Sequence, residues 1–343
     1  ATQRVAAEDT RPGKIDNELV VRLKPNSKLT IEEIAKQTRG TMLGKVDKLN
    51  AYRLRYETAE AAEAARKWIS EQTDVAAVEN NYRWEAPTTV EPSANSTAGA
   101  VGPLKPRLSP DGKNLVVGII DTAAQSMSPD KEAFVLSRQD LVSGQPTDDG
   151  LWHGTAMAEE FLRGVALTDT SEGGSTVRLR LYNTYGANET ATSFDVTRAV
   201  FKAAEDGVTI LSLSLGGPEP SPMLRDALDS FAQQGGLVFV AAGNQGTSAP
   251  YYPAADPNVV AVTAVNRAGE PMSWANWGNY VDVGAPGVTT VPFGGRTWVV
   301  SGTSPATALT AGMAAGYVGR TGASLPAARE VVLREMPFTP PRP

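Results

Sequence analysis

Hydrophobic and polar positions follow two different patterns in this 343-residue chain. In the first of them, between residues 17 and 87, short strand-like segments flank segments of helical periodicity. The strand segments are 18–23, 51–56 and 75–84, the helical segments are 30–38 and 58–73, and residues 40–46 form the third element of the series. Thr30 and Glu33 have capping-box spacing at the start of the first helix. The order β-α-β-β-α-β predicts a small α+β domain with a ferredoxin-like sheet.

The second pattern covers residues 111–343, where apolar strands alternate with amphipathic helices. The predicted strands include 114–120, 208–215, 237–243 and 258–265, and the predicted helices include 192–207 and 221–236. Strands without polar alternate positions are buried on both faces, which is typical of a parallel sheet between helical layers. The predicted fold class is therefore an α/β parallel sheet flanked by helices on both faces, preceded by the small α+β domain.

Two further segments lack either pattern. Residues 1–16 are polar and are predicted to be a flexible N-terminus. Residues 88–110 are rich in Pro, Ser, Thr, Ala and Gly, which indicates a linker. The predicted organisation is a flexible N-terminus (1–16), an α+β domain (17–87), a linker (88–110) and an α/β domain (111–343).

Composition excludes several kinds of function. The net charge is −6, from 32 basic and 38 acidic residues without a long basic run, which argues against a nucleic-acid partner. No apolar stretch approaches the 18 residues of a membrane span. The chain has no Cys, which excludes disulfides and thiol catalysis, and only one His. Any imidazole base must therefore be His153.

Four polar residues fall at the ends of predicted strands or the starts of predicted helices. Asp121 follows strand 114–120, Asn244 follows strand 237–243, and His153 begins a helix. Ser304 lies in "SGTSPATALTAG", where it and Thr303 could also serve only as a helix cap before Pro305. Each residue alone has such a structural explanation. Together they gather at the carboxyl edge of one sheet, where ligands bind in this fold class.

The chemistry of these four residues is complementary. A serine hydroxyl is a weak nucleophile that needs a base, and His153 can serve Ser304 in this way. Asp121 can accept from the other imidazole nitrogen and hold its tautomer. The Asn244 amide and the Ser304 backbone N–H can donate to an oxyanion, near the positive end of a helix dipole. The pattern predicts hydrolysis by acyl transfer.

Six motifs make the chain similar to the subtilisin-like serine proteases, the peptidase S8 family. They are "VVGIIDT" at Asp121, "HGT" at His153, "LSLSLGG" at 211–217, "AAGN" ending at Asn244, "YYPA" at 251–254 and "SGTS" ending at Ser304. The order Asp, His, Ser is that of subtilisin. Residues 17–87 resemble the propeptide inhibitor domain of the same family.

The resemblance implies a serine endopeptidase made as a proenzyme, whose N-terminal domain inhibits it and assists folding. Ser304 would be the nucleophile, His153 the general base, Asp121 its orienting carboxylate and Asn244 the oxyanion donor. The polypeptide substrate would bind as an extended strand between two edges. The residues implied in substrate binding are Ser214, Leu215 and Gly216 on one edge, Tyr185 and Gly186 on the other, and Tyr251 in the pocket for the residue before the cleaved bond.

The resemblance also bears on cofactors, specificity and location. No cofactor is required for the chemistry, and structural calcium stays open because no calcium loop is identifiable after the helix of His153. Tyr251 stands where the family often has Gly, which predicts a preference for small residues before the cleaved bond. Secretion or a periplasmic location is expected, with a cytoplasmic one left open.

Two departures from the family pattern keep a second class of function open. The sequence reads "HGTAMAEE" after His153 and "GTSPATALT" around Ser304, where the family usually has H-G-T-H-V-A-G and G-T-S-M-A-x-P-H. A catalytically silent subtilase-fold binding or scaffold protein is therefore the alternative. A doubly wound nucleotide binder is disfavoured, because "IIDTAAQS" has no glycine after the first strand.

Overall fold

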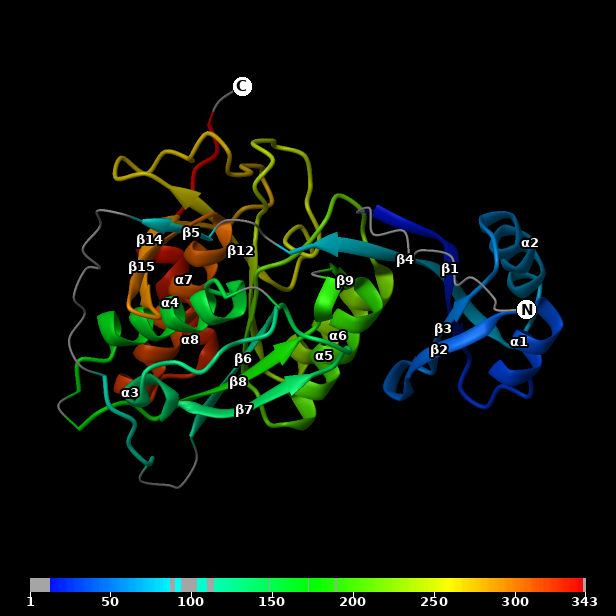
Figure 1. Cartoon of the computed structure of the whole chain (residues 1–343), viewed down its shortest axis with the longest axis horizontal. Helices are drawn as coiled ribbons and strands as arrows, with labels where there is room; N and C mark the ends of the chain where they lie inside the picture. Colours follow the sequence, from blue (N-terminus) through cyan, green and yellow to red (C-terminus); the bar gives the residue numbers. More distant parts are fainter. Residues whose placement is uncertain are drawn as a thin grey trace.

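The chain folds into a small N-terminal unit and a larger unit, joined by a long strand (Figure 1). The computed structural model describes residues 13–86, 90–93, 104–109, 114–147, 149–171, 173–188 and 190–341. We refer to residues 13–86 as the N-terminal unit and to residues 104–341 as the larger unit.

The N-terminal unit has the predicted ferredoxin-like order. Its elements are β1 (Gly13–Leu23), α1 (Ile31–Thr38), β2 (Thr41–Val46), η1 (Asp47–Leu49), β3 (Ala51–Arg55), α2 (Ala59–Ser70) and β4 (Val75–Glu85). The strands are antiparallel in the order β2-β3-β1-β4. The capping box of Thr30 and Glu33 is present at the start of α1. Both faces of the sheet are buried: Leu19 and Val21 of β1 pack in the unit's own core, while Val20 packs against Phe194 and Met223 of the larger unit.

The flexible N-terminus predicted for residues 1–16 is wrong for its last four residues. β1 begins at Gly13, which pairs with Arg83, and Lys14 pairs with Tyr82. Polarity alone suggested disorder, but the neighbouring strand β4 offers main-chain partners that polar residues use as well as apolar ones. Residues 1–12 lie outside the described residues.

The larger unit contains the predicted parallel sheet. Its seven strands, all in parallel pairs, follow the order β13-β12-β11-β10-β6-β8-β7. They are β6 (Leu115–Asp121), β7 (Val135–Asp140), β8 (Val177–Asn183), β10 (Ile210–Leu213), β11 (Leu237–Ala241), β12 (Val260–Val265) and β13 (Val283–Pro286). Successive residues of one strand enter opposite cores: Ile119 of β6 lies in one and Ile120 in the other.

Helices cover both faces of this sheet, as predicted. The helices are α3 (Pro129–Glu132), α4 (His153–Thr168), α5 (Ser193–Glu205), α6 (Pro222–Gln233), α7 (Thr303–Thr321) and α8 (Leu325–Glu335), with one turn of 3₁₀ helix, η2 (Gly186–Asn188). Residues of α5 and α6 pack in one core, and residues of α4, α7 and α8 pack in the other.

The small residues of α7 bring it into backbone contact with α4. A Cβ on Gly312 would lie 2.1 Å from the carbonyl oxygen of Phe161, and one on Gly164 would lie 2.2 Å from that of Leu309. Side chains at either position would separate the two helices. The sequence "ATALTAG" therefore places α7 deep in the fold, with its N-terminus at the carboxyl edge of the sheet.

The segment 88–110, predicted as a linker, includes a strand. β5 (Val90–Ser93) pairs antiparallel with β15 (Arg296–Ser301), whose other neighbour is β14 (Val288–Phe293). Residues 87–89, 94–103 and 110 lie outside the described residues. Composition could not reveal this strand, because β15 supplies the main-chain partners that order it.

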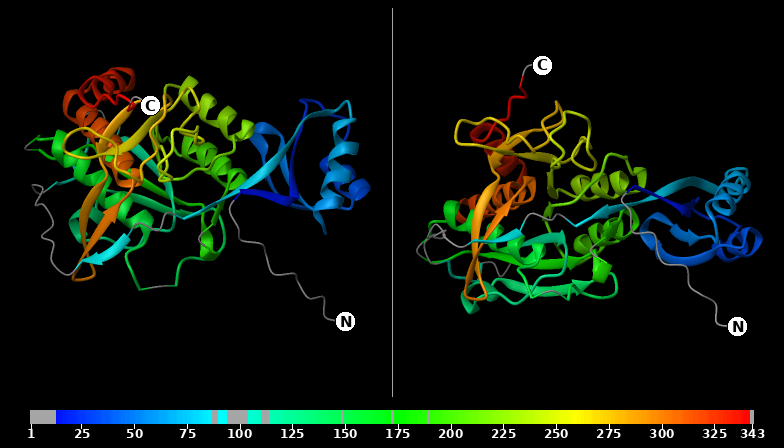
Figure 2. Two further views of the ribbon diagram at one scale, coloured as in Figure 1. Left: turned by 90° about the horizontal axis from the view of Figure 1, so that it is seen from above. Right: turned by 45° about the horizontal axis from the view of Figure 1, so that its top comes forward.

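The two units share a sheet. The end of β4 reaches the larger unit, as both views of Figure 2 show. There it pairs with β9 (Thr190–Thr192). A segment of the larger unit thus forms the fifth strand of the N-terminal sheet.

Candidate active site

Asp121 and His153 form a buried pair at the carboxyl edge of the parallel sheet. Asp121 ends β6 and His153 begins α4, and they are 1% and 5% exposed. Nδ1 of His153 lies 2.7 Å from Oδ1 of Asp121, which also accepts the N–H of Thr122 at 2.7 Å. A carboxylate at Nδ1 holds the imidazole in the tautomer whose Nε2 can accept a proton.

The glycine after His153 is explained by the close approach of α4 to the end of β6. A Cβ on Gly154 would lie 2.4 Å from the carbonyl oxygen of Thr122. The N–H of Gly154 donates to Oγ1 of Thr122 at 2.8 Å. A larger residue would push α4, and His153 with it, away from Asp121.

Ser304 lies in the first turn of α7 and is 2% exposed. The helix begins at Thr303 after Gly302, and neither Thr303 nor Ser304 is its N-cap residue. The interpretation of Ser304 as a helix cap before Pro305 is therefore wrong. Gly302 has φ 142°, in the region that favours glycine, and this conformation turns the chain from β15 into α7.

Nε2 of His153 is free to act as a base. It is buried without a hydrogen-bond partner in the described part of the chain, and no hydrogen bond there joins it to Ser304. Catalytic hydrogen bonds are often long before substrate binds, so this separation is compatible with a nucleophile–base pair.

Asn244 is held at the start of α7 by its carbonyl oxygen. Oδ1 accepts the N–H of Thr303 at 2.9 Å and its hydroxyl at 3.0 Å. Because Oδ1 faces these two donors, the Nδ2 group is left to donate elsewhere. The N–H of Ser304 belongs to the first turn of the helix and has no intrahelical acceptor. The sequence did not reveal that Thr303, inside the "SGTS" motif, orients the side chain of Asn244.

The loop that carries Asn244 is supported by Asn276, which sequence reasoning also missed. Asn276 is fully buried, donates to the carbonyl oxygen of Ala242 at 2.9 Å and accepts the N–H of Gln245 at 2.9 Å. Its signal in the sequence is weak, because "SWANWG" reads as an ordinary loop.

A cleft of about 770 Å³ lies in front of Ser304. The structure brings Ser214, Leu215, Gly216, Asn244 and Tyr251 to its wall, all of which the sequence placed in the site. Ser214 follows the end of β10, and its hydroxyl lies 3.4 Å from the carbonyl oxygen of Ser304.

Tyr185 and Gly186 are not at the edge where the sequence placed them. Their N–H groups both donate to Oδ1 of Asn183, and Gly186, with φ 64°, begins the turn η2. A turn cannot pair with an extended substrate. They line a separate cavity of about 140 Å³, and the edge strand on this side is instead β9, which pairs with β4 and follows "NTYGA" in the sequence.

Tyr251 fills part of the cleft. Its hydroxyl donates to the carbonyl oxygen of Gly216 at 2.9 Å. A Cβ on Gly216 or on Gly243 would lie 2.9 Å from its ring, so the ring lies against both glycines. Burial raises the pKa of the phenol, which stays a neutral donor.

The closing strand of the N-terminal unit enters the same cleft. Trp84, Glu85 and Ala86 line it together with Ser304. Trp84 is 3% exposed and packs in the core of the larger unit with Leu215 and Ala191. The N-terminal unit thus contributes part of the wall of the cleft.

The N-terminal unit contacts the N-termini of α5 and α6. Oδ1 of Asn81 accepts the N–H of Phe194 at 3.2 Å, and Oε2 of Glu79 accepts the N–H of Met223 at 2.9 Å. These acceptors complement N–H groups that have no partner within the helix. Arg22 adds an ion pair with Asp226 at 2.6 Å.

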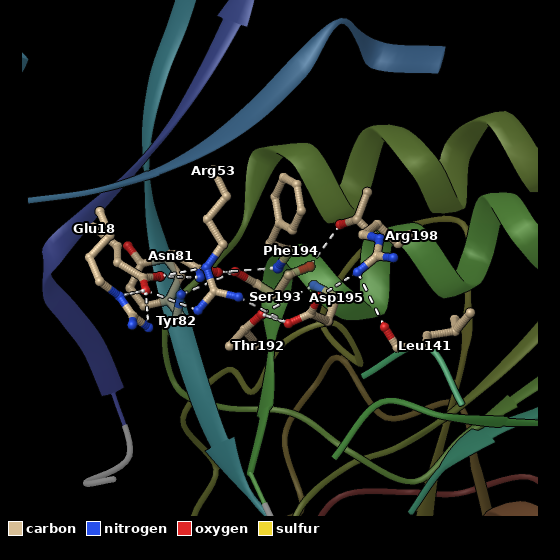
Figure 3. Close-up of polar contacts among 12 residues, drawn as sticks. Glu18, Arg53, Asn81, Tyr82, Leu141, Thr192, Ser193, Phe194, Asp195 and Arg198 are labelled. Carbon is tan, nitrogen blue, oxygen red and sulfur yellow. Dashed lines mark hydrogen bonds and ion pairs between the residues drawn. The ribbon is translucent and has the colours of Figure 1, made fainter. Parts of the chain in front are cut away.

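A buried charge orients these contacts (Figure 3). Glu18 is fully buried and accepts from Arg53, Arg55 and Asn81. Arg53 also reaches Asp195 of α5 at 3.3 Å. Burial acts to raise the pKa of Glu18, but the donors from Arg53 and its neighbours outweigh it and hold the pKa below its usual range. Burial raises the pKa of Glu79, against the opposing effects of the Met223 N–H and Arg22.

Metal and membrane features are limited in the part of the chain that the structure describes. It contains no group of three or more His, Asp or Glu side chains that could hold a metal ion. Structural calcium therefore stays a prediction to which no residues are assigned. None of the described helices combines the length and apolarity needed to cross a membrane.

Comparison with known families divides the chain as the fold does. Residues 112–326 match the subtilase family, peptidase S8, and residues 2–81 match the fervidolysin N-terminal prodomain.

Individual relatives agree with this match. The chain is 33% identical over 209 residues to a thermophilic serine proteinase of Bacillus sp. strain AK1, covering 58% of this chain and 51% of the relative. It is 33% identical over 216 residues to thermitase of Thermoactinomyces vulgaris, covering 60% and 75%. It is 30% identical over 294 residues to subtilisin amylosacchariticus of Bacillus subtilis subsp. amylosacchariticus, covering 79% and 72%.

Among solved structures, fervidolysin from Fervidobacterium pennivorans, described as a keratinolytic enzyme related to subtilisin, has the same fold. Its TM-score is 0.68 at 21% identity, and the match covers 92% of this chain and 56% of that chain. The chain thus spans about half the length of fervidolysin and of the Bacillus sp. strain AK1 relative.

Proposed function

The chain belongs to the subtilase family, and we propose that it is an endopeptidase that hydrolyses peptide bonds with Asp121, His153 and Ser304. The observation that carries this proposal is the Asp121–His153 pair at 2.7 Å, at the edge of the sheet where α7 presents Ser304. Nε2 of His153 has no hydrogen-bond partner among the described residues. The geometry favours Nε2 over Nδ1 as the base, because Asp121 occupies Nδ1.

In the proposed mechanism Ser304 Oγ attacks the substrate carbonyl while His153 Nε2 takes its proton. Asp121 stabilises the imidazolium that results. The oxyanion is stabilised by Nδ2 of Asn244 and the N–H of Ser304, both fixed before the reaction begins. His153 then returns the proton to the leaving amine, and water repeats the sequence on the acyl-enzyme. Pro305 removes an N–H beside the site but not that of Ser304.

A fluorophosphonate probe tests this proposal on the processed enzyme. We expect one adduct, on Ser304, that is lost in His153→Ala. The alternative, a catalytically silent binding protein, draws support from the unusual residues after His153 and around Ser304. Absence of labelling in enzyme freed of its N-terminal unit would favour that alternative and overturn the hydrolase.

The proposal includes the N-terminal unit as an intramolecular inhibitor that also assists folding. Trp84, Glu85 and Ala86 line the cleft and β4 pairs with the edge strand β9, which supports a block of substrate access. Cleavage is proposed within residues 84–100, and the positions of Ala86 in the cleft and Val90 on β15 favour the bonds between them. Ser304→Ala should purify as one uncut chain and wild type as two fragments that stay together. An intact wild-type chain with full activity would contradict this.

Substrate specificity and location complete the proposal. The Tyr251 ring against Gly216 and Gly243 supports a preference for small residues before the cleaved bond, because a filled pocket rejects large side chains. We also propose that the enzyme works in the medium or the periplasm, since a built-in inhibitor protects the cell during synthesis. Activity confined to the cytoplasmic fraction of the producing cells would contradict that location.

A further inference from the structure

The strand β5 occupies the outer edge of the β14–β15 hairpin. Its register is antiparallel, with Val90 opposite Val300, Glu91 opposite Val299, Pro92 opposite Trp298 and Ser93 opposite Thr297. β15 leads directly to the nucleophile, because Gly302 and Thr303 alone separate its last residue from Ser304. β5 therefore lies beside the segment that carries the nucleophile.

The direction of β5 is that of a substrate leaving the active site. Val90 pairs nearest to Ser304, and Ser93 pairs farthest from it. On the other side, β4 pairs with β9 and brings Ala86 into the cleft. The same chain thus approaches Ser304 along β9 and departs from it along β15. In a bound polypeptide, β15 would face the residues that follow the cleaved bond.

β5 is held weakly, whereas β15 is firm. Among the side chains of β5 that the structure describes, only Val90 packs against the core, whereas Glu91 and Pro92 are exposed. Pro92 also has no N–H to donate. β15 has β14 on its other side over six paired residues, and Trp298 and Val300 are buried. Loss of β5 would leave an ordered strand with a free row of main-chain groups, which can accept another strand.

We propose that the edge of β15, residues 297–300, is a docking strand for the polypeptide substrate beyond the cleaved bond, and that β5 fills it in the proenzyme. The substrate adds to the edge as an extended strand, through main-chain hydrogen bonds. An apolar or β-branched residue takes the place of Val90, and exposed residues take the places of Glu91 and Pro92. This inference rests on the proposed endopeptidase function.

Recognition of this kind depends on main-chain length more than on sequence. A peptide that ends soon after the cleaved bond cannot reach residues 297–300, whereas an unfolded protein chain can. The enzyme would therefore discriminate in favour of long, extended polypeptides. β5 remains attached to the larger unit after processing and competes for the edge.

Two quenched fluorescent peptides test the inference on the processed wild-type enzyme. They share all residues before the bond and end two or seven residues after it. We expect kcat/KM to be roughly tenfold higher for the longer peptide, the effect of a few added main-chain hydrogen bonds. N-methylation of the longer peptide, one amide at a time, should lower kcat/KM at every second amide, because alternate residues of a strand face its neighbour.

A variant of β5 tests whether β5 competes with the substrate for the edge of β15. Val90→Gly weakens β5, and it should raise kcat/KM for the longer peptide relative to the shorter one by a few-fold. The matched control is Leu108→Gly, which removes an aliphatic side chain that is 78% exposed and should leave the ratio unchanged. Equal rates for both peptides without alternation among the N-methyl peptides would overturn the inference and leave the proposed function standing. Hydrolysis of neither peptide would overturn both.

Discussion

The N-termini of α5 and α6 are closed by the N-terminal unit, whereas the N-terminus of α7 opens into the cleft. At α5 the N–H of Phe194 binds Asn81, and at α6 the N–H of Met223 binds Glu79. At α7, Asn244 accepts the first N–H with its carbonyl oxygen, and the next N–H, that of Ser304, has no acceptor within the helix. The same unsatisfied groups serve docking in one region and oxyanion binding in the other.

The difference lies in the acceptor that each helix meets. Asn81 and Glu79 are permanent acceptors that bury the helix ends. At α7 the charged acceptor is the oxyanion of the substrate, which would exist only during the reaction. An interaction with it therefore lowers the free energy of the transition state without stabilising the bound substrate. Substitutions in the cleft should therefore change turnover. Substitutions in the interface should change latency, by which we mean the degree to which the bound N-terminal unit inhibits the enzyme.

The largest effect is expected for the residues of the cleft that move a proton. Ser304→Ala and His153→Ala should each lower kcat by roughly 10⁶-fold, the size known for subtilisin, a relative. The double variant should be no worse than either single one, because the residues act as a unit. Steady-state kinetics on a peptide substrate measures this. Losses that multiply would show that the two residues act separately.

The next effect concerns the N-terminus of α7 itself. Asn244→Ala should lower kcat by about 10² to 10³, the size known for the equivalent donor of subtilisin, with little change in KM. The oxyanion exists only in the transition state, so substrate binding is spared. A large change in KM at unchanged kcat would contradict the role of Asn244.

A smaller effect is expected at the wall of the cleft. Wild type should prefer Ala over Phe or Lys before the cleaved bond. Tyr251→Gly should raise kcat/KM for Phe by about tenfold or more, which corresponds to about 1.4 kcal/mol. The control Tyr251→Phe keeps the ring and should keep the preference for Ala. A wild-type preference for Phe, unchanged in Tyr251→Gly, would show that the ring does not fill the pocket.

In the interface, removal of an acceptor at α5 should weaken latency without changing turnover. Asn81→Ala should increase the free activity of the processed complex by about fivefold, in line with the loss of one helix cap. The matched control is Asn17→Ala, since Asn17 bonds within the N-terminal unit to Tyr56. Progress curves after dilution measure both. Equal latency in the two variants would show that the α5 contact contributes nothing to inhibition.

The smallest effect concerns pH. The pKa of Glu79 is raised in the interface. The contribution of Glu79 to the stability of the interface is therefore fully present below the ordinary glutamate pKa of about 4.3, and it is lost as pH rises through the raised pKa. Glu79→Gln should remove this dependence of latency on pH. Above the raised pKa of Glu79, latency should be about two- to threefold higher in the variant than in wild type. Latency measured from pH 4 to 8 tests the sign. The same pH slope in both proteins would exclude Glu79 as its source.

The sequence by itself determined the two folded units, the parallel sheet between helices and the four residues at its carboxyl edge. These features are encoded locally: apolar periodicity specifies the elements, and "HGT" and "SGTS" specify close approaches and turns that only small residues allow. Strand ends of a parallel sheet meet at one edge, so Asp121 and Asn244 could be placed together without knowing the register.

Only the tertiary structure decided which segments pair across long distances. It made β9, and not Tyr185 and Gly186, the edge strand on that side of the cleft. It also ordered β5 inside a segment with the composition of a linker and placed Asn276 against the loop that carries Asn244. Main-chain groups carry no residue-specific signal, so an unpaired edge accepts whichever strand the rest of the fold brings to it. That choice depends on the whole fold and is absent from any local stretch of sequence.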